Sequence, residues 1–209
     1  MPGDRAAAAG RGRGLAVPGP NAGARNCLGL ALLARERDEE AREQFAEAVR
    51  FRPEFADTRA NLAGVPFRQG KMDAGIEQCR EVLRNHPRHV RAHTDLGLVL
   101  MQREDFQEAA MHFAASLAKR PDHAPTRARL GAALLHLDRP PEARGELERA
   151  LALDPSLVSA RIDLALALAG EGRPEDAALP LSEAPRRDPG NATARNYVEI
   201  LSAAPPGAR

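Results

Sequence analysis

Histidines form the densest group of residues in this sequence that could do chemistry. The stretch HPRHVRAH holds His86, His89 and His93, and the last two are four residues apart, a spacing that can bind a metal ion from one helical face. No cysteine or carboxylate stands beside them to complete a ligand set, and His123 recurs 34 residues after His89. The pattern therefore favours a solvated turn over a metal site.

Other motifs with catalytic chemistry are absent from the sequence. Cys27 and Cys79 have no CxxC or other metal-ligand spacing, and we interpret them as small apolar residues on helices. There is no H-E-x-x-H, no G-x-S-x-G and no glycine-rich phosphate loop, and the GRGRG near the N-terminus lacks the following strand and helix that such a loop needs. We therefore predict a protein that is not an enzyme and that uses no cofactor or metal.

Composition narrows the classes of partner. Lys and Arg total 30 against 29 Asp and Glu, so the sequence offers no net charge to attract nucleic acid or an anionic membrane. Six Phe, one Tyr and no Trp are too few aromatics for base stacking, and no apolar run reaches the roughly 20 residues of a membrane span. We expect a cytoplasmic protein without membrane insertion. Residues 1–21 are broken by Gly, Pro and Arg and are predicted to be a flexible leader.

The elements that must position any site follow a repeat of 34 residues. Proline recurs at this interval five times, and so does a leucine, each time followed by Gly or Ala. The prolines are Pro53, Pro87, Pro121, Pro155 and Pro189, and the leucines are Leu28, Leu62, Leu96, Leu130 and Leu164. Further leucines four residues on place both on one helical face, and breakers such as RQGKMD and GEGRPE separate two helices per repeat. One such helix pair cannot bury its apolar face alone, whereas stacked pairs can.

This pattern resembles the tetratricopeptide repeat. The element L-G-x-x-L is present as LGLAL (28–32), LGLVL (96–100) and LGAAL (130–134), and A-x-x-x-F…A as AREQFAEA (41–48) and AAMHFAAS (109–116). The family's aromatic residue early in the first helix is missing throughout. Its positions hold Arg25, Arg59, His93, Arg127 and Arg161, a departure that we expect to loosen lateral packing without threatening the fold.

The resemblance implies an all-α fold, an α-solenoid that winds as a right-handed superhelix with a concave groove. Five helix-turn-helix repeats are expected at 22–55, 56–89, 90–123, 124–157 and 158–191. A capping helix is predicted at 192–202, because Tyr197, Ile200 and Leu201 could cover the last repeat, and a frayed tail at 203–209.

The family geometry also implies which side chains face the groove. The candidates for contact with a bound peptide are Asn26, Asn61, Arg68, Arg91, Thr94, Asp95, Gln102, Arg129, His136 and Asp163. Two groove chemistries of the family fit poorly. A clamp for a terminal carboxylate would keep only Asn61 and, loosely, Arg91, and an asparagine ladder before each leucine keeps only Asn61. An extended peptide could still bind Asn61 through its backbone and the arginines and aspartates through its charges.

We therefore predict a scaffold or adaptor that binds a protein or peptide partner in the groove. Two alternatives remain open. The chain could be the regulatory or substrate-recruiting region of a larger transferase-type enzyme, or a scaffold that assembles with itself as a homo-oligomer.

Pro66 occupies a position that is leucine in the other four repeats. A proline in a helix interior costs about 3 kcal/mol, since it removes a hydrogen bond and clashes with the preceding turn. If this is a drifted repeat, Pro66→Leu should raise the melting temperature in a thermal denaturation experiment. A lower melting temperature would instead mean that a kink at Pro66 is part of the native packing and opens the groove between the first and third repeats.

Overall fold

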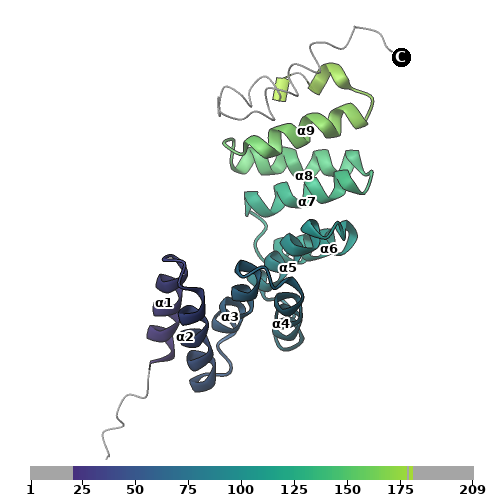
Figure 1. Cartoon of the computed structure of the whole chain (residues 1–209). Helices are drawn as coiled ribbons and strands as arrows, with labels where there is room; N and C mark the ends of the chain where they lie inside the picture. Colours follow the sequence, from purple (N-terminus) through teal and green to yellow (C-terminus); the bar gives the residue numbers. More distant parts are fainter. Residues whose placement is uncertain (1–20, 178, 181–209) are drawn as a thin grey trace, which may run out of the picture.

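The chain folds as a stack of antiparallel helix pairs (Figure 1). The computed structural model describes residues 21–177, 179 and 180, and this part of the chain contains helices and no strand. The helices are α1 (Ala22–Leu33), α2 (Asp38–Phe51), α3 (Ala56–Arg68), α4 (Met72–Asn85), α5 (Val90–Gln102), α6 (Phe106–Leu117), α7 (Ala124–His136), α8 (Pro140–Leu153) and α9 (Val158–Gly170). A further helical segment begins at Pro174. The predicted fold class, an all-α helical solenoid, is confirmed.

Three parts of the predicted organisation fall on residues that the structure does not describe. They are the leader (apart from Asn21, which caps α1), the capping helix at 192–202 and the tail at 203–209. None of the described helices is long and apolar enough to cross a membrane.

The two helices of a repeat touch where glycine meets a large side chain. Gly29 on α1 lies under the ring of Phe45 on α2, and a Cβ added to this glycine would be 2.5 Å from the ring. Gly97 meets Phe113 in the same way, and Gly131 meets Leu147. Both phenylalanines and Leu147 are fully buried. In these three repeats, close helix approach therefore requires the small residue after the leucine.

The second repeat exchanges these roles between its helices. Ala63 replaces the glycine on α3, and Cys79 replaces the phenylalanine on α4, which removes much of the large side chain's volume. Phe67 of α3 fills the space from the other side and lies over Gly75 of α4, where a Cβ would be 2.2 Å from the ring. Pro66, beside this phenylalanine, is buried inside α3. The repeat that departs most from the pattern is thus packed by compensating changes in size.

Every turn between paired helices contains one residue with positive φ. These residues are Glu36, Gly70, Glu104, Asp138 and Gly172, again 34 apart. The next residue donates its backbone N–H to a carbonyl in the last turn of the first helix, as in Arg37 to Leu32 (3.0 Å) and Lys71 to Pro66 (2.9 Å). This left-handed C-terminal motif satisfies carbonyls that would otherwise lack a partner. The carbonyl of Pro66 keeps this role although its nitrogen cannot donate.

Residues that form hydrogen bonds occupy the position early in the first helix where the family has an aromatic residue. The side chains of Arg59, Arg127 and Arg161 each donate to the carbonyl of the proline six residues earlier, at 2.8–2.9 Å. His93 contacts the carbonyl of Pro87 in the same way, at 3.0 Å. These side chains tie the starts of α3, α5, α7 and α9 to the turns before them, and so replace packing by polar contacts.

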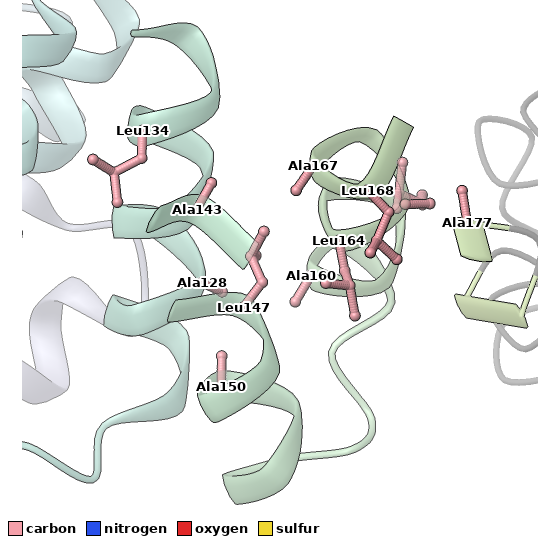
Figure 2. Packing of buried hydrophobic residues seen from close by; sticks show 12 residues of the cluster. Ala128, Leu134, Ala143, Leu147, Ala150, Ala160, Leu164, Ala167, Leu168 and Ala177 are labelled. Carbon is pink, nitrogen blue, oxygen red and sulfur yellow. The ribbon is translucent and has the colours of Figure 1, made fainter. Parts of the chain in front are cut away.

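Apolar residues on neighbouring repeats join into continuous cores. In the fourth and fifth repeats, Leu147 and Ala150 of α8 pack in one cluster with Ala160 and Leu164 of α9 (Figure 2). The central repeats share a second cluster that runs from Ala60 to Phe113. At the N-terminal end the stack is less covered, since Leu28 and Leu30 of α1 are 49% and 39% exposed.

The space around two glycines predicts opposite effects when each is replaced by alanine. Gly75→Ala should lower the free energy of unfolding by about 1–3 kcal/mol, because the new methyl group would overlap the ring of Phe67. Gly145→Ala in α8 should raise it by up to about 1 kcal/mol, since no atom lies within 4 Å of the added Cβ and alanine favours helix. Urea denaturation followed by circular dichroism measures both. Equal effects of the two changes would contradict the packing of Phe67 on Gly75.

Candidate binding groove

Polar and apolar side chains share one face of helix α5. Arg91, Asp95, Leu98 and Gln102 are spaced i, i+4, i+7 and i+11, so they lie along one face of the helix. The neighbouring helix α3 contributes residues beside them, and together they border two hollows that follow each other along α5.

The first hollow, here called the apolar cavity, has a volume of about 360 Å³ and is bordered by α3 and α5. Its apolar lining consists of Leu33, Phe67, Met72, Leu98 and Val99. Asn61, Arg68, Arg91, Asp95 and Gln102 add polar groups around them. Half of the ten residues predicted from the sequence therefore meet at this cavity.

The second hollow, here called the basic cavity, has a volume of about 490 Å³ and lies at the N-terminal ends of α5 and α7. It is lined by Asp57, Arg88, His89, Val90, Arg91, Thr94, Asp95, Arg120 and His123. Arg91 and Asp95 border both cavities, so the two form one groove along α5.

His89 and His123 cap the helices that they precede. The Nδ1 atom of His89 accepts the backbone N–H of Ala92 (3.2 Å), and that of His123 accepts both the backbone N–H (3.3 Å) and the hydroxyl (2.8 Å) of Thr126. The interpretation of His89 as a solvated turn residue is wrong, since its side chain is only 10% exposed. Because Nδ1 accepts in each ring, the hydrogen is on Nε2.

The acidic residues of the basic cavity already have partners. The Nε2 atom of His89 donates to a carboxylate oxygen of Asp57 at 3.1 Å, and Arg91 donates to Asp95 at 3.4 Å. Burial raises the pKa of Asp95, and the neighbouring Arg91 opposes that rise. Burial also lowers the pKa of His123, as do Arg120 and Arg129, which favours its neutral form.

Asn61 is committed to a contact inside the stack. Its Nδ2 donates to Oδ1 of Asn26 (2.8 Å), which also accepts the hydroxyl of Thr58 (3.1 Å). Asn61 is only 5% exposed. The amide donor that the sequence suggested for a peptide backbone is therefore used to join α1 to α3.

The remaining predicted residues lie elsewhere. His136 and Asp163 line a third cavity of about 340 Å³ between α7 and α9, together with Asp138 and Leu166. Thr94 lines the basic cavity, and its hydroxyl lies 2.9 Å from that of Ser116. Arg129 lines none of these three cavities, but its charge acts on both Asp95 and His123.

Sequence reasoning missed the contribution of the turns between repeats. Arg88, Arg120 and His123 line the basic cavity, and none of them is among the groove residues predicted from the sequence. The recurrence of histidine two residues after proline, at His89 and His123, was the available signal. No group of three or more His, Cys, Asp or Glu residues in the described part of the chain is placed to hold a metal ion.

Comparison with known families finds the same repeat. Three models described as tetratricopeptide repeat match residues 21–52, 65–125 and 100–156, which together span more than half of the chain. No curated protein is a significant match to the sequence.

Solved structures resemble this fold. The structure titled "Functional Characterization of Pseudomonas Aeruginosa pilF" has a TM-score of 0.74 at 22% identity, with 87% of each chain covered. A mutant of the protein MamA has a TM-score of 0.67 at 24% identity, covering 80% of this chain and 97% of its own. A thermophilic TPR protein of Thermus thermophilus, TTC0263, has a TM-score of 0.62 at 19% identity and covers 88% of this chain and 100% of its own. At these identities the likeness shows the fold alone.

Asp163 in the third cavity should make stability depend on pH. Burial raises its pKa from 3.8 to about 6, and no hydrogen-bond or ion-pair partner for it lies among the described residues. Its folded pKa exceeds its unfolded pKa, so its stabilising contribution is complete below pH 3.8 and is lost as the pH rises through 6.

Asp163→Asn should therefore raise the free energy of unfolding at pH 7.5, by about 1–3 kcal/mol, and have little effect near pH 4. Thermal denaturation between pH 4 and 8 measures the difference. Asp122→Asn, which removes the same charge from an exposed turn, is the control. A pH-independent effect of Asp163→Asn would refute this role for burial.

Proposed function

The chain belongs to the tetratricopeptide-repeat family, and we propose that it is a protein-interaction scaffold that holds an extended peptide of its partner in the groove along α5. The observation that carries this proposal is the continuity of the apolar and basic cavities, which share Arg91 and Asp95. Their lining combines exposed charged groups with apolar side chains, the mixture found where proteins bind peptides.

The dimensions of the groove suit a short peptide segment. Helix α5 runs from Val90 to Gln102, a length of roughly 18 Å at 1.5 Å per residue. An extended chain covers this distance with about five or six residues at roughly 3.3 Å each. Because the helices that border the groove are held by buried cores, ordering them would cost little when the peptide binds.

Arg91 and Gln102 are the best positions for testing this proposal. Both side chains are exposed on the groove face of α5, at its two ends, and neither belongs to the buried core. Asn61 is a poor choice because its loss would also break the contact with Asn26. Gln107 and Met111 of α6 provide a matched control, since both are exposed and border a different cavity.

Peptides selected from a displayed random library on the full chain should lose about ten-fold or more in affinity to the Arg91→Ala/Gln102→Ala variant. Binding to Gln107→Ala/Met111→Ala should stay within about two-fold of wild type. Fluorescence anisotropy measures the affinities, and circular dichroism checks that both variants fold. Selected peptides that bind the groove variant as tightly as wild type would refute the proposed site. A molecular mass of the protein that rises with its concentration would favour the self-assembling scaffold instead.

A further inference from the structure

Unpaired cations gather at one end of the groove. Most arginines and lysines of the described residues bond to a neighbouring side chain or carbonyl, but five have no such side-chain partner there. They are Arg35, Arg88, Lys119, Arg120 and Arg129. Two of these line the basic cavity, and the charge of Arg129 acts on His123 in its wall. Arg88, Arg91 and Arg120 outnumber Asp57 and Asp95 in the lining, so the basic cavity keeps a net positive charge.

The repeat itself explains why no carboxylate accepts a hydrogen bond from His123. In one repeat the Nε2 of His89 donates to Asp57. His123 is the equivalent of His89 one repeat later, and the residue equivalent to Asp57 is Arg91. The Nε2–H of His123 consequently has no acceptor among the described residues, and an arginine stands where its acceptor would be.

The other end of the same groove, the apolar cavity, offers a surface for an apolar side chain. Phe67 and Leu98 are partly exposed in the apolar cavity, beside Leu33 and Met72. Along α5, Val90 of the basic cavity and Leu98 of the apolar cavity are eight residues apart, or roughly 12 Å. About four residues of extended chain would cover that offset.

Resting on the function proposed above, we propose that the bound peptide is acidic at one end and apolar at the other. Its carboxylates contact Arg88, Arg120 and the Nε2–H of His123, and a large apolar side chain about four residues away lies between Phe67 and Leu98. Charge complementarity carries this choice, since Asp57 and Asp95 are already paired and leave the arginines free for an anionic partner. These cations come from the turns between repeats, outside the positions of the carboxylate clamp considered from the sequence.

The composition of groove-dependent peptides tests the proposal. Among library peptides that bind wild type and lose affinity to Arg91→Ala/Gln102→Ala, we expect Asp or Glu to be enriched three to five residues from Leu, Phe or Met. Groove-dependent peptides that are basic or uncharged would overturn this inference and leave the proposed function standing. The absence of any groove-dependent peptide would overturn both.

A second experiment reverses the charge of two arginines that line the basic cavity. Arg88→Glu/Arg120→Glu should weaken binding of an acidic selected peptide by about ten-fold or more at 50 mM salt, and the difference should shrink at 500 mM as screening grows. Arg149→Glu, at an exposed position on α8, makes the same change of charge per site away from the groove and should have little effect.

Replacing the peptide's acidic residues by Lys should restore binding to the Arg88→Glu/Arg120→Glu variant. Equal weakening by Arg149→Glu, or no restoration, would count against the basic cavity as the site. Amidating the peptide's terminal carboxyl shows whether side chains or the terminus supply the carboxylate.

Discussion

Close approach of the two helices inside each of the first four repeats is the constraint on which the rest of this structure depends. A glycine on one helix receives a ring or branched side chain from the other, and a Cβ there would lie 2.2–2.6 Å from that side chain. Atoms cannot approach so closely, so each contact requires glycine and holds the two helices at one distance. Since each pair buries its apolar face only by stacking on its neighbours, this local contact also sets the geometry of the groove.

The second repeat shows how the constraint can be met in another way, and with what consequence. Phe67 takes over from the missing phenylalanine of α4 and packs on Gly75. The same ring lines the apolar cavity beside Leu98. A change that compensates for lost volume in the core thereby also shapes the surface on which we propose that a peptide binds.

Equivalent positions in neighbouring repeats can differ in whether their polar groups have hydrogen-bond partners. The histidine caps of α5 and α7 are equivalent, but only His89 has a carboxylate beside its Nε2. Arg91 replaces that carboxylate one repeat later, so a capping residue becomes part of a cationic surface. In a stack of similar units, departures from the repeat are therefore the places where recognition of a partner can arise without disturbing the fold.

The sequence by itself determined the period of 34 residues, the helix pairs and the small residues between them, because these depend on neighbours along one helix and on repeated spacing. It also indicated Arg91, Asp95 and Gln102, which share a face of α5. Only the tertiary structure decided that Asn61 is used by Asn26, that Phe67 replaces a side chain of the other helix, and that Arg88 and Arg120 lie beside His123. These contacts join residues from different repeats or helices, and their distances depend on how the helices pack, which the spacing of residues along the chain does not specify.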